Sequence, residues 1–393
     1  MVSKIIFVFL QKNIIQFMKF IVSTSALLKQ LQSISGALAG NKVLPILDSF
    51  LFDIQKSNVT LCSSDLETSM ITTLEIECKE SIKVAIEGKQ LMDVLKNLTE
   101  QPLTFNIDAE NYSVEINSDN GIYKLNGEDG DNFPKVPKQN GESTPVTMAG
   151  STLYHIVAST SFAIGTEELR PAMTGLFFQL GADGSSFVGT DAHRLVCVKR
   201  ADISYAESAN FIVPRKSILI VKNILPNDLT PVSISFDKNN AYFDCGKIQL
   251  VCRLIDAKYP DYEAVIPTEN PNQLFISKDD LLAALKRVCI FSNKTTNQVA
   301  LKLKGSTLHI EGQDLDFSNE ANESLVCNYN GADMEIGFNG KFLIDMLTAI
   351  QADNIKLEMS TPSRAGIIVP ENQPENEKLL MLIMPIMLSG NYD

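Results

Sequence analysis

The chain has 393 residues, of which 45% are hydrophobic and 21% charged, and its formal net charge is −13. This composition is ordinary for a globular protein with buried cores, and it excludes collagen-like and intrinsically disordered classes. Seven cysteines, an odd number without a CxxC pair, argue against a disulfide framework and a zinc site. They favour reduced thiols and a cytoplasmic location.

The chain opens with an apolar run at residues 5–10. This run is too short for a membrane span or for a full signal-peptide core. A repeating pattern begins at Met18, so we predict that residues 1–17 are an N-terminal extension outside the fold. An amphipathic membrane anchor is the alternative for these residues, and the pattern does not decide whether translation starts at Met1 or Met18.

One short pattern returns six times along the chain. It consists of an apolar strand end, three or four polar residues, and a helix-like run whose first buried position is Leu or Ile. The registered positions are Leu27, Leu91, Leu153, Ile218, Leu281 and Leu343, at intervals of 64, 62, 65, 63 and 62 residues. A fixed period indicates stacked copies of one supersecondary unit. The predicted helices are at residues 25–38, 89–98, 151–162, 215–225, 278–291 and 341–352.

Between the helix windows, short segments alternate apolar and polar residues, which is typical of half-buried antiparallel strands. For the pair at residues 113–117 and 122–126, Asn120-Gly121 predicts a tight hairpin in which these two residues take positive φ angles. Further strands are predicted at residues 59–62, 69–76, 232–236, 241–245, 247–254, 300–304, 307–311 and 355–359. The predicted fold class is therefore α+β.

Two units are expected to share a core, because a single helix cannot cover both faces of a sheet. Six units then make three domains. Proline and polar residues cluster at residues 131–145 and 256–273, and these segments echo each other through Phe133-Pro134 and Tyr259-Pro260. We place the extension at residues 1–17 and the three domains at residues 18–141, 142–270 and 271–393.

Catalytic signatures are scarce. The sequence has three histidines and no HExxH, GxSxG or Walker A pattern. Asp191 and His193, with a serine such as Ser186, are the best hydrolase candidate, and this remains an alternative function. The main prediction is a protein without catalytic residues, metal or cofactor.

Charge is distributed unevenly. The six helix windows together carry +6, so the remainder of the chain carries −19. Basic helices favour an anionic partner, although lysines on a solvated helix face are the plainer explanation.

The chain ends in an apolar run, residues 379–388, which predicts a closing strand. Pro385 cannot donate to a strand ladder, so the residues around it are expected at an edge or outside the sheet. Met384, Ile386, Met387 and Leu388 would then be available to line a surface groove, where flexible methionines suit several partners.

Several motifs occur in unbroken order from Met18 to Leu388. They are MKFIVSTSALLKQL at Met18, LPIL at Leu44, TDAHRL at Thr190, FIVPRKSI at Phe211, YPDYEAVIP at Tyr259, MEIGFN at Met334 and MPIML near the end. Together they resemble the beta sliding clamp family of bacterial DNA polymerase III. The resemblance implies three tandem domains of the DNA clamp fold, each made of two βα-type repeats with two helices packed on antiparallel sheets, forming half of a six-domain ring.

The resemblance also implies a function. Two copies would form a head-to-tail homodimeric ring around double-stranded DNA, without sequence preference, and would tether the replicative DNA polymerase and other replication and repair proteins. A clamp loader would be a further partner, with no membrane and no catalysis involved. An exported repeat adhesin is a further alternative, opposed by the unpaired cysteines and the lack of a signal sequence.

Family roles transfer by position to three groups of residues. DNA contacts correspond to Lys42, Arg215 and Lys216, and helix placement alone adds Lys29, Lys89, Lys96 and Lys222. A groove for short apolar partner peptides, between the second and third domains, corresponds to Met173, Thr190, His193, Arg194, Leu195, Pro260, Val265, Leu382, Ile383, Met384, Pro385 and Ile386. Ring closure is expected at Ile290 and Phe291, meeting Tyr123 and Leu125, with charge pairing from Glu320 and Glu323.

A few positions depart from the family pattern. Ala192 stands where glycine is usual in TDxHRL, and Met173 where leucine is common. Pro171-Ala172 replaces aromatic DNA contacts of some relatives, which puts those contacts in doubt. The tail at residues 389–393 extends past the usual end and is expected to obstruct part of the groove.

Overall fold

In a computed structural model, the structure describes residues 17–40, 44–139 and 144–388. Residues 1–16 of the predicted extension, Lys42 and the tail at residues 389–393 therefore lie outside the described residues. The first strand begins at Phe17. The chain forms two compact units, one made of Met1–Pro145 with Pro231–Arg253 and the other of Val146–Thr230 with Leu254–Asp393.

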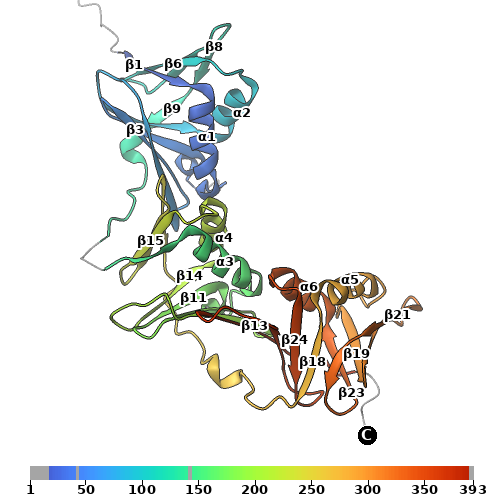
Figure 1. The fold of residues 1–393 in the computed structure, drawn as a ribbon. Helices are drawn as coiled ribbons and strands as arrows, with labels where there is room; N and C mark the ends of the chain where they lie inside the picture. Colours follow the sequence, from blue (N-terminus) through green and yellow to red (C-terminus); the bar gives the residue numbers. More distant parts are fainter. Residues whose placement is uncertain (1–16, 41–43, 140–143, 389–393) are drawn as a thin grey trace, which may run out of the picture. The chain divides into compact units, whose positions relative to one another are not determined.

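The first unit has two antiparallel sheets and two helices. One sheet has the strand order β1 (Phe17–Ser23), β6 (Pro102–Asp108), β7 (Val114–Asn117) and β8 (Ile122–Leu125). The other runs in the order β15 (Pro231–Phe236), β16 (Asn240–Asp244), β17 (Ile248–Arg253), β4 (Thr68–Glu75), β3 (Asn58–Ser64), β2 (Ser49–Ile54), β5 (Ile82–Glu87) and β9 (Gly127–Asp129). The helices α1 (Thr24–Ile34) and α2 (Gly88–Asn97) lie in contact with each other (Figure 1).

The second unit also has a larger and a smaller antiparallel sheet, but four α-helices among its described residues. Its larger sheet has the order β14 (Ala209–Pro214), β11 (Gly175–Leu180), β12 (Ser185–Thr190), β13 (Arg194–Arg200), β26 (Glu377–Ile383), β25 (Gly366–Pro370), β24 (Asn354–Met359), β18 (Asn272–Ser277) and β22 (Asn328–Asn330). The smaller sheet has the order β21 (Asn319–Val326), β20 (Thr307–Asp314), β19 (Gln298–Lys304) and β23 (Met334–Asn339). Its helices are α3 (Gly150–Thr160), α4 (Arg215–Ile224), α5 (Lys278–Val288) and α6 (Gly340–Ala349), and a short strand, β10 (Val146–Ala149), precedes α3.

Each of the six described α-helices follows a strand directly, as the repeat predicted. Every registered Leu or Ile is at most 2% exposed. Burying one such side chain contributes about 1.5–3 kcal/mol, which explains why this position stays apolar in every copy. The helices also pack in consecutive pairs, α1 with α2, α3 with α4, and α5 with α6. The predicted α+β class with two helices to a shared core is confirmed.

The hairpin of β7 and β8 forms as predicted, but its turn does not. Asn117 pairs with Ile122, so the connection has four residues. Neither Asn120 nor Gly121 has a positive φ, and the Ser118 N–H donates to the Gly121 carbonyl at 2.9 Å. Four-residue hairpin loops are commonly built on a type I turn, which needs no left-handed residue. The prediction of positive φ angles was wrong because an Asn-Gly pair favours them in a two-residue loop, whereas four residues separate these strands.

The C-terminal strand β26 is the predicted closing strand. It pairs with β13 from Arg194↔Ile383 to Arg200↔Glu377. β26 ends two residues before Pro385, and the chain then leaves this sheet, with Met384 and Met387 exposed. The prediction that residues around Pro385 leave the sheet is therefore correct.

A charged network ties the beginning of β26 to its neighbours. Glu377 Oε1 lies 2.9 Å from His155 Nε2 on α3, and Glu377 Oε2 accepts from Arg200 Nη1 at 2.8 Å. Arg200 also donates to Asp202 Oδ2 at 2.6 Å. Burial alone would raise the pKa of Glu377, but the hydrogen bonds and positive charges of His155 and Arg200 outweigh it. The pKa of Glu377 is therefore lowered.

No helix among the described residues is long and apolar enough to cross a membrane.

The lowered pKa of Glu377 predicts a pH-dependent contribution to stability. Because its folded pKa lies below its unfolded pKa, the stabilisation is complete above the ordinary value of 4.5 and is lost as the pH falls through the folded value. We expect Glu377→Gln to lower the free energy of unfolding at neutral pH by about 1.5–3 kcal/mol. The difference from wild type should shrink as the pH falls below 4.5.

Urea unfolding at several pH values measures this difference. Glu375→Gln, at an exposed neighbouring carboxylate, is the matched control and should match wild type throughout. If the free energy of unfolding of Glu377→Gln stays below that of wild type by the same amount down to low pH, the ionised Glu377 carboxylate is not the source of the stabilisation.

Candidate functional site

Residues predicted for the partner groove meet where β13 begins and β26 ends. The Met384 N–H donates to the His193 carbonyl at 2.9 Å, and Leu195 is the register partner of Leu382. The Gly165 N–H, between the carbonyls of Met173 and Thr190, donates to both at 2.9 and 3.2 Å. The fold therefore gathers residues that are almost two hundred positions apart in the sequence.

The predicted residues divide by exposure. His193, Val265 and Met384 are exposed, and Met173, Pro260, Pro385 and Ile386 are half-buried. We call these seven residues the partner patch. Thr190, Arg194, Leu195, Leu382 and Ile383 are buried.

The buried members support the patch from within. Leu195 and Leu382 belong to a cluster with Tyr259 and Tyr262. The Tyr259 ring stacks on Phe177 with ring centroids 4.3 Å apart. Burial raises the pKa of Tyr259, whose hydroxyl donates to a strand carbonyl and remains protonated at neutral pH. These side chains form core packing beside Pro260.

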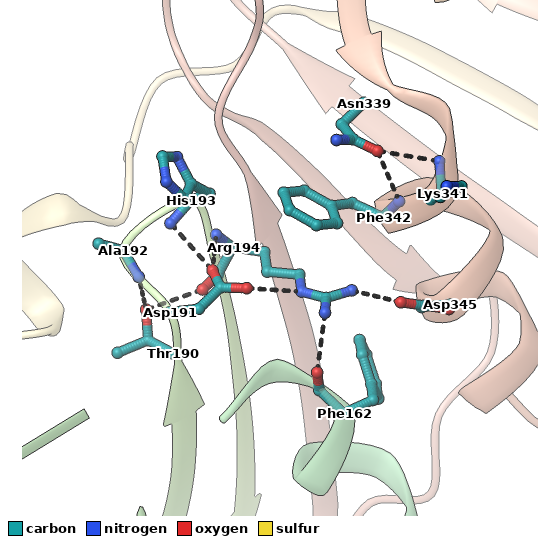
Figure 2. A network of polar contacts seen from close by, with 10 residues as sticks. All are labelled: Phe162, Thr190, Asp191, Ala192, His193, Arg194, Asn339, Lys341, Phe342 and Asp345. Carbon is teal, nitrogen blue, oxygen red and sulfur yellow. Dashed lines mark hydrogen bonds and ion pairs between the residues drawn. The ribbon is translucent and has the colours of Figure 1, made fainter. Parts of the chain in front are cut away.

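A strained turn precedes β13. Ala192 has φ +73°, in the left-handed region that favours glycine. Its N–H donates to Thr190 Oγ1 at 3.1 Å, and that hydroxyl donates to the Arg194 carbonyl at 2.7 Å. Asp191 Oδ1 accepts the N–H groups of His193 and Arg194 at 3.0 and 2.9 Å (Figure 2). These bonds hold the turn in place despite the strain at Ala192.

Arg194 joins this turn to α6. Its Nε donates to Asp191 Oδ2 at 3.0 Å, its Nη1 to Asp345 Oδ2 at 2.7 Å, and its Nη2 to the Phe162 carbonyl at 2.8 Å. Figure 2 shows the guanidinium between Asp191 and Asp345, and its Cζ lies 4.3 Å from the centre of the Phe342 ring. The side chain is 10% exposed, so Arg194 acts as an internal brace with little surface for a partner.

Asp345 and Phe342 did not emerge from the sequence. They lie about 150 positions from Arg194, and nothing in their helical spacing distinguishes them from other residues of the same helix. Only the tertiary packing of α6 identifies them as part of this site.

The hydrolase alternative is not favoured by the geometry. Both carboxylate oxygens of Asp191 accept bonds from backbone N–H groups or from Arg194, and no bond joins the carboxylate to the His193 ring in the described part of the chain. His193 lies instead near the Phe342 ring, with centroids 6.4 Å apart. Residues 17–40, 44–139 and 144–388 also contain no group of side chains arranged to hold a metal ion.

The basic candidates for DNA contact lie on helices. Lys29 is on α1, Lys89 and Lys96 are on α2, and all three are exposed. The Lys96 Nζ atom lies 3.8 Å from Asp93 Oδ1 on the same helix. The other three are on α4, where Lys216 is exposed while Arg215 and Lys222 are half-buried.

Arg215 differs from the arginines that brace the fold. Arg194, Arg200 and Arg287 each bind carboxylates. Arg215 has no hydrogen bond or ion pair with the described residues, and its Nε is buried without a partner there. The guanidinium of Arg215 is therefore not committed to a carboxylate of the described chain.

The ring-closure candidates differ in accessibility. Ile290 and Phe291 follow α5 and are 63% and 40% exposed, whereas Leu125 is 5% exposed and belongs to the core. Tyr123, on β8, is half-buried. Glu323 is held by Arg287 through two bonds of 2.7 and 2.6 Å, which lower the pKa of Glu323.

On β21, Glu320 is exposed and lies beside Asn322, whose Nδ2 donates to Glu320 Oε1 at 2.8 Å.

Comparison with known proteins gives one consistent family. Models of the N-terminal, central and C-terminal domains of the DNA polymerase III beta subunit match residues 18–137, 147–261 and 263–387. The chain is 27% identical to the beta sliding clamps of Pseudomonas aeruginosa and Escherichia coli K12, covering 94% of this chain and 100% of each relative.

Solved structures of sliding clamps have the same fold as this chain. The sliding clamp of Pseudomonas aeruginosa bound to griselimycin is 26% identical with a TM-score of 0.88, covering 95% of this chain and 100% of that chain. The DNA polymerase sliding clamp of Bacillus subtilis, at 22% identity, shares the fold with a TM-score of 0.89 over 95% of this chain and 100% of its own.

The left-handed conformation at Ala192 predicts that glycine is preferred there. We expect Ala192→Gly to raise the free energy of unfolding by about 1 kcal/mol, because glycine takes this φ without the Cβ clash. Urea unfolding measures the change. Ala201→Gly, at an exposed alanine without positive φ, is the control and should bring no gain. Equal effects of the two substitutions would contradict the strain argument.

Proposed function

Because the chain belongs to the DNA polymerase III beta subunit family, the beta sliding clamps, we propose that two copies close head to tail into a ring around duplex DNA. The ring acts as a processivity factor. It is a non-catalytic subunit in the cytoplasm, placed on DNA by a clamp loader, and it tethers the replicative polymerase and other replication and repair proteins.

The observation that carries this proposal is the sixfold repeat. Six strand–helix junctions with the same buried register lie in the described chain, and their helices pack in three consecutive pairs. Two copies supply twelve such helices. A head-to-tail contact that closes after two copies gives a ring, whereas one that does not close gives a filament.

Free basic side chains support the DNA assignment. Lys29 and Lys89 are exposed and have no side-chain ion pair among the described residues, and Arg215 is likewise unpaired. Enclosed DNA needs only weak and mobile phosphate contacts, since strong ones would impede sliding. The proposed DNA contacts also include Lys42, Lys96, Lys216 and Lys222.

The partner patch is the proposed site for short apolar peptides of the tethered proteins. Met384 is 44% exposed and Val265 57%, and Leu195 and Leu382 beneath the patch belong to a packed core. Rigid support reduces the entropy lost on binding, and a flexible methionine adapts to different peptides. His193, also exposed, adds a polar contact beside them.

Topological enclosure predicts a specific response to DNA ends. Clamps loaded on nicked circular DNA should stay bound through a high-salt wash, because enclosure does not depend on phosphate contacts. Cutting the circle should release them. Gel filtration of labelled clamp with DNA measures retention, and clamps that remain on linear DNA with free ends in high salt would contradict enclosure.

The partner patch predicts a local effect of one substitution. Met384→Asp should weaken binding of a peptide from the replicative polymerase at least tenfold, because a carboxylate replaces an apolar contact. Fluorescence anisotropy measures peptide affinity.

Leu169→Asp, at a 95% exposed leucine outside the patch, is the matched control. Unchanged peptide affinity in Met384→Asp, with the dimer intact, would show that the partner patch is assigned wrongly.

A further inference from the structure

The first unit contains a turn with the same hydrogen bonds as the turn before β13. It consists of residues 64–68, between β3 and β4, and we call it the first-unit turn. The Leu66 N–H donates to Ser64 Oγ at 3.2 Å, and Asp65 Oδ1 accepts the N–H groups of the next two residues in the turn at 3.0 and 2.6 Å. Leu66 has φ +78°, beside +73° for Ala192. Because this conformation is rare for residues other than glycine, the two turns indicate one structural plan used twice.

The strand beside each turn is also placed alike. Strand β17 pairs with β4 in the first unit, as β26 pairs with β13 in the second. The Arg253 N–H donates to the Glu67 carbonyl at 2.8 Å, and the Met384 N–H donates to the His193 carbonyl at 2.9 Å. Glu67 therefore corresponds to His193, and Arg253 corresponds to Met384.

The supporting core is repeated as well. Phe133 is buried in an apolar cluster of the first unit, as Tyr259 is in the second. The proline that follows each aromatic residue, Pro134 or Pro260, is half-buried. The first unit thus has the turn, the adjoining strand and the proline that the partner patch has in the second unit.

Space for a peptide side chain is present beside the first-unit turn. A hollow of about 530 Å³ adjoins β17, and more than half of its lining residues are apolar, among them Val136, Tyr242 and Val251. Val251 precedes Arg253 by two positions in the same strand, so both side chains lie on one face of the sheet. Leu66 is 56% exposed and adds apolar surface at the turn itself. Lack of room or of apolar surface therefore does not distinguish this turn from the partner patch.

The two copies differ in charge. Glu67 and Arg253 are exposed and stand where the partner patch has His193 and Met384. An apolar peptide that covered them would remove a carboxylate and a guanidinium from water, which is unfavourable unless the peptide supplies matching charges. The matching bonds of Glu67 and Arg253 come from their backbone groups, so the turn does not depend on these side-chain types.

Resting on the proposed peptide site, we infer that Glu67 and Arg253 are specificity residues. Their charges keep the apolar peptides of tethered proteins off the first-unit turn. Each chain then offers these peptides one site, the partner patch, and the tethered proteins have to exchange at that place.

A gain of binding tests this inference. Glu67→His with Arg253→Met should add a site, so titration calorimetry with the peptide from the replicative polymerase should give two peptides per chain instead of one. In a chain that also carries Met384→Asp, the same pair should tighten peptide binding at least tenfold, because the charges no longer have to be covered. Glu77→His with Lys56→Met is the matched control, at exposed charged residues beside another hollow of the first unit. It should leave one site.

The reverse exchange tests whether charge is the cause. His193→Glu with Met384→Arg places the charges of the first-unit turn in the partner patch. This pair should weaken peptide binding at least tenfold more than the uncharged pair His193→Gln with Met384→Gln. Equal losses in the two variants would refute exclusion by charge. This comparison decides alone if Glu67→His with Arg253→Met does not fold.

The number of bound peptides separates this inference from the proposed function. If wild type binds one peptide per chain and folded Glu67→His with Arg253→Met also binds one, the partner patch stands and this inference is refuted. Two peptides per wild-type chain would refute it as well. If wild type binds no peptide, the proposed peptide site fails, and this inference fails with it.

Discussion

The pairing of β13 with β26 is the interaction on which the second unit depends. It joins a strand near the middle of the chain to the last strand, in a register from Arg194↔Ile383 to Arg200↔Glu377. A slip of one residue would turn every side chain of β26 to the opposite face and separate Leu195 from Leu382. The partner patch exists because this register places the end of β26 beside the turn before β13.

Both ends of this pairing are secured by charges. Arg200 and His155 hold Glu377 at one end, and Arg194 joins Asp191 to Asp345 at the other. Satisfied charges of this kind resist rearrangement, because removing one partner leaves an uncompensated buried charge. The strained φ of Ala192 persists inside this bonded frame. For the proposed peptide binding, a turn that is fixed in advance reduces the ordering cost.

Periodicity in the sequence predicted the repeat, the six helices and the closing strand, because each depends on which face of an element is apolar. It could not predict what each face touches. Leu125 and Ile383 were expected at contact surfaces, yet both are buried, since alternation along a strand does not separate core from interface. Asp345 was missed for the same reason, as its role depends on a residue in a distant strand. The turn at Asn120 was predicted wrongly because an Asn-Gly pair does not by itself determine the turn type of a four-residue loop.

Some basic side chains of this protein stabilise the fold through ion pairs, and others are proposed to contact DNA. Arg194, Arg200 and Arg287 form ion pairs with carboxylates of the same chain. Arg215 has no such partner among the described residues. Phosphate contacts through free cations weaken with salt, but burial of apolar side chains does not. In the proposed ring, closure by apolar contact can therefore persist while the contacts with DNA remain weak. Sliding and retention are compatible because they depend on different forces.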